Sequence, residues 1–428
     1  MKQFFTKKNI LIASFIFCFS IIVTRIITVP LYDSGKARDA IHGDAYSDKN
    51  AYSAALYFYD FGFSNTYYLP VLGYKGNKDL TGASVYTHYP ALPDILAGTY
   101  AKIFDTKNDK LLRIIPVFIS VAFFFFIFYF LKTLLPNQEA AFIGALALVL
   151  SNYFIFWGDN LHKHLYEEFL KWLYVFFLYI YYRDGKRKKW LIVLCGLIFV
   201  LATNISFEPV TYLAVITIGL SWIFDRKIFS WENILLGITP VIGFALHFYQ
   251  NICLFNSFEL AFADMASSAT MRTVGDSSIQ NEMKRSLSVI DYLDIPLMWM
   301  RRIERYFLIP GPAFAFLAYL GLKELKNQDK KLYGLGITLI LATLSWNVAM
   351  TQHSIVHGFT TRHLGLLFGF VTGYGLLSYF QLLKSDWAGK LVYRKIIHIG
   401  FIGYIVVMLL SQQLVDIFRY GYLYSFFN

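Results

Sequence analysis

Residues 42–63 read HGDAYSDKNAYSAALYFYDFGF and lie within a polar segment, residues 30–110, that two long apolar runs enclose. Asp48 stands at the start of a run whose apolar residues recur at helical spacing, and Asp44 lies shortly before it. This pattern predicts an amphipathic helix along a membrane surface, with carboxylates near its N-terminus. From its position alone, Asp48 is equally well interpreted as an N-cap.

The chain is strongly apolar. Of its 428 residues, 57% are hydrophobic and 16% are charged, whereas soluble domains carry about 25% charged residues. We therefore expect a polytopic membrane protein. The net charge of +11 would suggest a nucleic-acid partner in a soluble protein, but here the basic residues follow membrane topology, so none is expected. The three cysteines lie in or beside apolar runs and predict neither a disulfide framework nor a metal cluster.

A helix needs about 20 largely apolar residues to cross the hydrocarbon of a bilayer. On this basis the sequence predicts an all-α integral membrane fold of about eleven transmembrane helices, forming a single domain over residues 1–428. Surface helices are expected in a long first extracytoplasmic loop. The predicted spans are residues 9–29, 112–134, 138–157, 167–183, 190–205, 208–224, 233–254, 306–323, 332–350, 363–383 and 396–417.

The positive-inside rule orients these spans. Lys and Arg gather in the short segments at every second connection, such as RDGKRKK at residues 183–189. This pattern predicts a cytoplasmic N-terminus and an outer C-terminus, in a bacterial cytoplasmic (inner) membrane. Two long loops, residues 30–110 and 255–305, then meet residues 351–363 on the outer face.

The first loop continues with YTHYPALPDILAG at residues 86–98. Its prolines restrict the residues before them to extended geometry, which predicts a rigid corner that opens a short helix. His88 lies at this corner. A lone histidine there is more often structural, but it shares the loop with the carboxylates, so we consider it a candidate substrate contact.

The segment 152–169 is polar and is expected on the outer face. Its candidate substrate contacts are Asp159, Glu167 and Glu168. His162 and His164 could bind zinc with a carboxylate, but their spacing is no recognised ligand motif, so a polar loop with one functional acid is favoured. Glu208 lies between the fifth and sixth spans, and acids buried in membranes are functional by default.

Outer-face arginines and histidines form the last group. The candidate substrate contacts among them are Arg302, Arg305, His357, Arg362 and His363. Arginine binds phosphate through a planar fork and keeps its charge. Contact with lipid head groups is the alternative interpretation for some of these arginines.

These features resemble the GT-C glycosyltransferases, the polyprenyl-phosphate-sugar-dependent membrane enzymes that include protein O-mannosyltransferases and lipid A aminoarabinose transferases. The family's first loop has an acidic start, a tyrosine four residues later and an alanine-rich helix. The residues that look like this motif are Asp48, Tyr52, Ala54, Ala55 and Gly62. Other similar elements are Pro90-Ala91-Leu92, Leu112-Arg113, residues 196–210 and residues 357–362. Lys49 stands where the family often has a second acid.

The resemblance implies transfer of a sugar from a polyprenyl-phosphate donor to a hydroxyl of a glycan, lipid or protein acceptor, with inversion. Asp48 or Asp44 would be the general base, with Tyr52 nearby in the substrate site. Mg²⁺ or Mn²⁺ could bind these two carboxylates, but such ions prefer several oxygen ligands and this loop has no dense acidic cluster, so we expect no metal cofactor.

Two alternatives remain open. An oligosaccharide polymerase or ligase would use a lipid-diphosphate glycan, although those proteins usually carry their large polar loop late in the chain. A transporter or flippase of lipid-linked sugars should place ionisable residues within its spans, whereas here nearly all charges lie at the predicted span ends.

Overall fold

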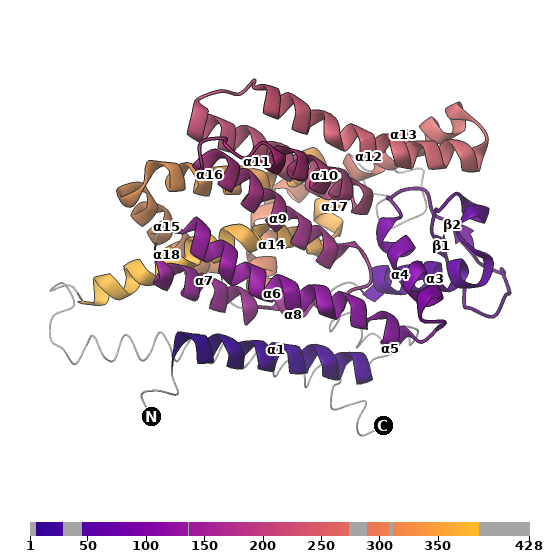
Figure 1. Cartoon of the computed structure of the whole chain (residues 1–428), viewed down its shortest axis with the longest axis horizontal. Coiled ribbons are helices and arrows are strands. Elements are labelled where there is room, and N and C mark those ends of the chain that lie inside the picture. Colours follow the sequence, from indigo (N-terminus) through magenta and orange to yellow (C-terminus); the bar gives the residue numbers. More distant parts are fainter. Residues whose placement is uncertain (1–5, 29–44, 136, 274–288, 308–310, 385–428) are drawn as a thin grey trace.

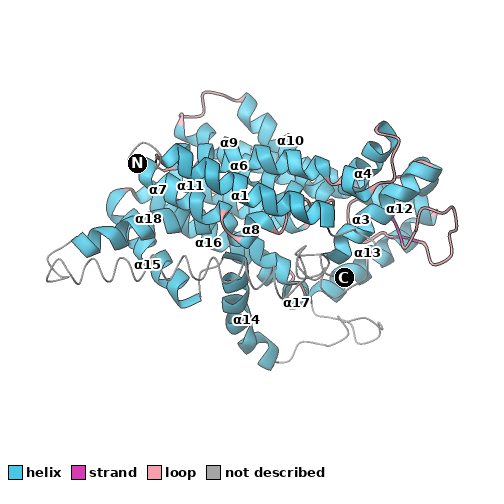
Figure 2. Ribbon diagram, turned by 90° about the horizontal axis from the view of Figure 1, so that it is seen from below, coloured by secondary structure: helices cyan, strands magenta, loops and turns pink. Residues whose placement is uncertain are grey.

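The computed structural model describes residues 6–28, 45–135, 137–273, 289–307 and 311–384. Asp44 and the predicted span 396–417 lie outside these residues. Figure 2 shows that the described chain is almost entirely helical, with a single small sheet among the described residues. That sheet is an antiparallel hairpin of β1 (Val71–Leu72) and β2 (Ser84–Val85). The all-helical character predicted from the sequence is confirmed.

The helices follow the predicted apolar runs closely. The α-helices are α1 (Lys7–Thr28), α3 (Ala45–Phe61), α4 (Leu92–Ile103), α5 (Asp109–Leu112), α6 (Ile114–Leu134), α7 (Gln138–Val149), α8 (Asn152–Ile155), α9 (Lys163–Arg183), α10 (Trp190–Ile205), α11 (Glu208–Asp225), α12 (Trp231–Phe255), α13 (Phe258–Thr273), α14 (Val289–Phe307), α15 (Gly311–Gln328), α16 (Lys330–Ala349), α17 (Thr351–Val356) and α18 (Gly365–Lys384). Two 3₁₀ helices are η1 (Ser64–Thr66) and η2 (Gly358–Leu364).

Within the described residues, four helical stretches are long and apolar enough to cross a membrane. They are Asp109–Leu134, Trp231–Phe255, Lys330–Ala349 and Gly358–Leu382. The number eleven therefore stays a prediction. The predicted span 138–157 is divided into α7 and α8. Ser151 is extended there and its hydroxyl donates to the Leu148 carbonyl, which ends α7.

The long helices lie side by side, and α3, α4 and the hairpin gather at one end of the bundle (Figure 1). Glycines allow α18 to pack closely between α7 and α15. A Cβ on Gly373 would lie 2.3 Å from the Ala140 carbonyl oxygen, and one on Gly375 would lie 2.3 Å from that of Leu317. Small residues at such contacts let helix backbones approach within a membrane.

The predicted first-loop helices are present as α3 and α4, but α3 does not lie on the surface with one face exposed. Residues 51–58 are all buried, because α4 and the hairpin pack against this helix. Gly98 of α4 brings the backbone against Phe58, since an added Cβ would lie 2.8 Å from the Phe58 Cβ. The alanines of α3 therefore serve close packing rather than membrane contact.

Candidate active site

Asp48 lies in the first turn of α3 and is fully buried. Its Oδ1 accepts hydrogen bonds from Asn160 Nδ2 at 2.7 Å, from the Leu161 amide at 2.8 Å and from the His162 amide at 3.1 Å. These N–H donors stabilise the negative charge and fix the orientation of the carboxylate. The first loop and the segment 152–169 therefore meet at Asp48. The sequence predicted both parts but not their contact.

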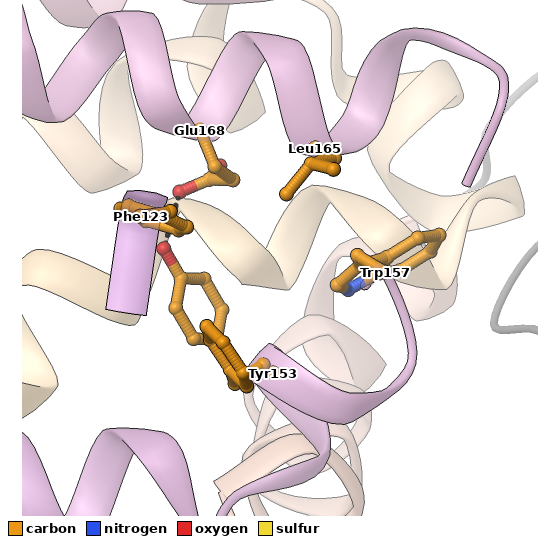
Figure 3. Close-up of a pocket in the computed structure, with 6 residues that line it drawn as sticks. Phe123, Tyr153, Trp157, Leu165 and Glu168 are labelled. Atoms are coloured by element: carbon orange, nitrogen blue, oxygen red, sulfur yellow. Dashed lines mark hydrogen bonds between the residues drawn. The ribbon is translucent and has the colours of Figure 1, made fainter. Parts of the chain in front are cut away.

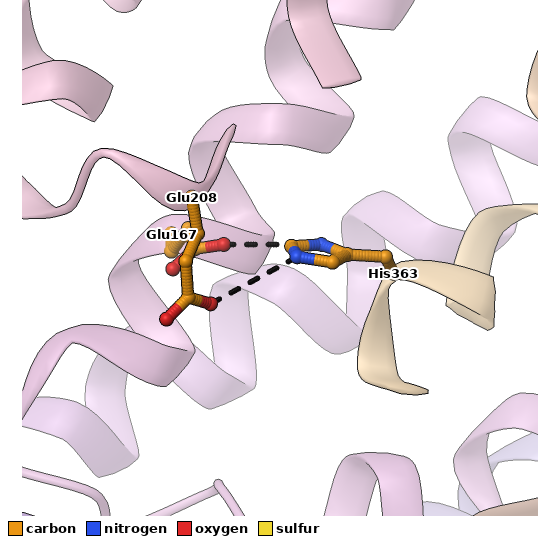
Figure 4. A group of neighbouring side chains, drawn as sticks. All are labelled: Glu167, Glu208 and His363. Atoms are coloured by element: carbon orange, nitrogen blue, oxygen red, sulfur yellow. Dashed lines mark ion pairs between the residues drawn. The ribbon is translucent and has the colours of Figure 1, made fainter. Parts of the chain in front are cut away.

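A buried ionic cluster begins one residue beyond this contact. It consists of Lys163, Glu167, Glu168, Lys171, Glu208, Arg362 and His363. Arg362 lies at its centre and is fully buried. Its Nη2 is 2.5 Å from Glu167 Oε2 and 2.7 Å from Glu208 Oε2, and its Nε is 3.4 Å from Glu168 Oε1. Figure 4 shows Glu167, Glu208 and His363 converging in this cluster.

Two lysines of α9 complete the ionic cluster. Lys163 pairs with Glu208, and Lys171 pairs with Glu168. Lys171 Nζ also lies 2.6 Å from His363 Nδ1. An ammonium group can only donate, so His363 Nδ1 accepts and the ring proton of a neutral His363 is on Nε2. That nitrogen lies 3.8 Å from Glu208 Oε2.

The formal charges of the ionic cluster cancel, because three glutamates face two lysines and one arginine. Arg362 therefore has no surplus charge to offer a lipid phosphate. The contacts of Arg362 with these glutamates therefore do not favour the predicted binding of a phosphate by this residue. The cluster instead joins α9, α11 and η2, and removing one member would leave an uncompensated buried charge.

A metal ion could be considered at one edge of the ionic cluster. The ligand atoms of Glu167, Glu208 and His363 lie within 4.8 Å of one another. However, Arg362 Nη2 contacts both carboxylates. A positive group thus already stands where a divalent cation would bind, and we place no metal there.

A small cavity of ≈ 10 Å³ lies beside Glu168. Figure 3 shows it between Tyr153, Trp157 and Glu168. The Tyr153 hydroxyl donates to Glu168 Oε2 at 2.8 Å and accepts from Trp172 Nε1 at 3.1 Å. A cavity of this size has room for about one water molecule, so this part of the ionic cluster is closely packed.

A second buried ion pair holds Asp159, which the sequence predicted as a substrate contact. Its Oδ2 accepts from Arg113 Nε at 3.1 Å, and both residues are fully buried. The pair ties the start of α6 to the segment before α9. The next residue, Asn160, donates to Asp48, so this ion pair lies directly beside the proposed base.

The second outer loop reaches the first through α13. His88 Nε2 lies 3.0 Å from Asp264 Oδ1, and Arg272 Nη2 donates to the His88 carbonyl oxygen at 3.3 Å. Arg272 also donates to the Ser268 carbonyl, and no carboxylate in the described part of the chain forms an ion pair with it. The sequence indicated that these loops share a face but gave no signal for Asp264 or Arg272.

Other predicted contacts lie in the packing around the site. The Tyr52 hydroxyl donates to the Lys107 carbonyl at 2.5 Å. Arg302 donates to the carbonyl oxygens of Ser354 and Ile355, at 2.6 and 2.8 Å. The His357 ring stacks against Phe359, with ring centroids 4.8 Å apart. The side chain of Arg305 lies outside what the structure describes.

Asp94 is a buried acid that no pattern in the sequence singles out. It lies in the first turn of α4 and is fully buried. No other residue of the described chain donates to its carboxyl group, and only its own backbone amide lies nearby. Burial raises the pKa of Asp94 to about 8. Tyr166 of α9 lies close enough to sense the charges of both Asp48 and Asp94.

No protein-family model and no curated protein sequence matches this chain. Among solved structures, it is similar to the apo oligosaccharyltransferase of Archaeoglobus fulgidus, with a TM-score of 0.49 and 13% identity over 94% of this chain and 56% of that chain. It is also similar to the archaeal oligosaccharyltransferase AglB of that organism in complex with an inhibitory peptide and a dolichol-phosphate. That match has a TM-score of 0.49 and 12% identity, and it covers 95% of this chain and 56% of the other.

The chain thus spans little more than half the length of the oligosaccharyltransferase structures that it matches.

Proposed function

We propose that this chain is a membrane glycosyltransferase of the GT-C kind. It moves one sugar from a polyprenyl-phosphate donor to an acceptor hydroxyl on the outer face of the membrane. Asp48 takes the proton of the acceptor as its oxygen bonds to the anomeric carbon. The bond between that carbon and the phosphate oxygen breaks, and polyprenyl phosphate leaves. A single displacement of this kind inverts the configuration at the anomeric carbon.

The observation that carries this proposal is the position of Asp48. Three donors from the segment between α8 and α9 hold one oxygen of its carboxylate. A buried carboxylate that is held in this way is oriented before the substrate arrives, and a base must lie within hydrogen-bond distance of the proton it takes. Proton transfer then requires that Oδ2 face the acceptor hydroxyl.

The departing phosphate needs a cation that is not already neutralised. Arg362 is paired with carboxylates, whereas Arg272 is partly exposed and donates to backbone carbonyl oxygens. Arg272 therefore replaces Arg362 as our candidate for the phosphate, and it acts beside His88. The guanidinium fork matches two phosphate oxygens.

The test is transfer from polyprenyl-phosphate-linked sugars to membrane extracts by the purified protein in detergent. Asp48→Asn should reduce kcat by at least 100-fold, because general acid–base catalysis contributes roughly 10²–10⁴-fold. Asp79→Asn is the matched control, since this exposed aspartate lies on the hairpin loop of the same segment. A parallel reaction with EDTA tests whether Mg²⁺ or Mn²⁺ is needed.

The two alternatives make different predictions in the same assay. A polymerase or ligase would consume a lipid-diphosphate glycan and leave the monophosphate donor untouched. A transporter would move the lipid-linked sugar across liposomes without cleaving it, and Asp48→Asn would leave that movement unchanged. Equal transfer by wild type and Asp48→Asn would remove Asp48 as the base.

A further inference from the structure

Asp94 is the buried titratable group that the proposed mechanism leaves unused. It follows Pro93 in the first turn of α4, and its side chain has no solvent exposure. Apart from its own backbone amide, no group in the described part of the chain donates a hydrogen bond to either carboxyl oxygen. Taking an unpaired charge out of water is costly, so such a group keeps its proton instead.

The surroundings of Asp94 place it beside the proposed site. Figure 1 shows α4 next to α3, which carries Asp48. Tyr166 of α9 senses the charges of both Asp48 and Asp94, which places the two acids near the start of α9. Burial raises the pKa of Asp94, and no cation among the described residues lowers it. The carboxyl group stays neutral, and in that form it can both donate and accept hydrogen bonds.

A neutral buried carboxyl without a partner weakens the folded state, and an apolar side chain of similar shape would be more stable in its place. The hydroxyl groups of a sugar offer the partners that Asp94 lacks, because each can donate and accept. We propose that Asp94 binds a hydroxyl group of the transferred sugar. This inference rests on the proposed function, since it makes the donor's sugar the ligand of the same site.

Two substitutions of Asp94 test this role. Asp94→Asn keeps a neutral donor and acceptor of the same size, whereas Asp94→Leu keeps the branched shape in a larger side chain and removes both. We expect Asp94→Asn to stay within about 3-fold of the wild-type kcat/KM, and Asp94→Leu to lose roughly 10-fold or more, since a substrate hydroxyl then lacks its partner. Asp48→Asn, the same chemical change at the proposed base, should instead reduce kcat by at least 100-fold.

Binding separates this inference from the proposed function. The probes are polyprenyl-phosphate hexoses and pentoses, compared with polyprenyl phosphate that carries no sugar. Asp94→Leu should weaken binding of at least one sugar-bearing lipid roughly 10-fold and leave the sugar-free lipid unchanged, whether or not the protein transfers the sugar. If Asp94→Leu does not fold, Asp94→Ala takes its place, with thermal unfolding as the check.

Any one of four results would overturn the inference. In the first, Asp94→Leu binds and transfers like wild type. In the second, Asp94→Leu binds the sugar-bearing and the sugar-free lipid equally more weakly. In the third, wild type itself binds both lipids equally well. In the fourth, Asp94→Asn loses as much transfer activity as Asp48→Asn, which would exclude a role for Asp94 as a neutral hydrogen-bonding group. In each case transfer by wild type and its loss in Asp48→Asn would still support the proposed function.

Discussion

Asp94 is a carboxyl group that folding keeps protonated, and this links stability to pH. Its pKa rises from 3.8 to about 8 through burial. The N-terminal turn of α4 stabilises the ionised form of Asp94 by only about 0.3–1 kcal/mol. Burial opposes that form by the several kcal/mol that correspond to the rise in pKa, so burial dominates. Between these two pKa values the folded state binds more protons than the unfolded state. Stability therefore falls as pH rises through that range.

The variant Asp94→Asn should remove this dependence. We expect its melting temperature in detergent to vary less than that of wild type between pH 4 and pH 8, and to exceed it near pH 8. Asp60→Asn is the informative comparison. Burial opposes ionisation of Asp60, but hydrogen bonds from Lys107 and Tyr74 outweigh burial and lower its pKa. Its contribution to stability is present at neutral pH and is lost only in acid. An unchanged pH profile in Asp94→Asn would contradict the burial argument.

Glu208 faces two cations of the ionic cluster, Lys163 and Arg362. Glu208→Gln would leave these charges undercompensated in a buried place. Breaking a buried pair in this way costs about 3–5 kcal/mol, so we expect a large drop in melting temperature. The matched change is Asp184→Asn, which removes a partly exposed partner of Arg183 and should cost about 0–1 kcal/mol. Equal effects of the two substitutions would show that the cluster does not hold α9 and α11 together.

The sequence predicted some of these residues and missed others for physical reasons. Asp48 was found because an acid at the start of an amphipathic run and a family motif coincide. Asp94 was missed because its lack of partners depends on packing by residues distant in the chain. Lys171 was also missed, although a lysine within an apolar run indicates a buried partner. Its contact with His363 could not be predicted from the sequence, because that contact depends on how η2 packs against α9.

At the scale of the helix, close contact of α18 with its neighbours depends on glycine. Gly373→Ala would place a Cβ 2.3 Å from the Ala140 carbonyl oxygen of α7. The helices must separate to admit it, which costs about 1–3 kcal/mol. Gly237→Ala on α12 is the control, because nothing lies within 4 Å of an added Cβ there. Alanine is favoured over glycine in a helix by about 1 kcal/mol, so the control should be neutral or stabilising. Thermal unfolding in detergent separates the two, and equal melting temperatures would argue against close packing.

Helices were easier to predict than their contacts. Apolar runs gave the positions of α6, α12 and α16 because a membrane permits few alternatives to a helix. The division between α7 and α8 depends on a hydroxyl that turns back to its own helix, which an apolar pattern does not reveal. The approach of α13 to His88 likewise depends on Asp264 and Arg272, which lie in another loop.

At the scale of the molecule, α9 links the proposed active site to the basic residues 183–189. It has 21 residues and, at 1.5 Å per residue, is about 30 Å long, which matches the hydrocarbon thickness of a bilayer. Its N-terminal end carries Lys163 beside the segment that holds Asp48. Its other end leads into the basic residues 183–189, which the positive-inside rule assigns to the cytoplasm. The proposed active site and the basic loop should therefore lie on opposite sides.

Single cysteines, one on the first loop and one in the basic segment after α9, test this orientation. Asn77 is exposed on the first loop and Lys188 is exposed after α9, so each accepts a cysteine without disturbing the core. In a background with Cys18, Cys195 and Cys253 changed to alanine, a membrane-impermeant maleimide should label Asn77→Cys on intact cells. Lys188→Cys should react only after the membrane is opened. Labelling of both from one side would place the two ends of α9 on the same face. Reversed labelling would turn the proposed site towards the cytoplasm, where the lipid-linked donor and the outer acceptor could not meet as proposed.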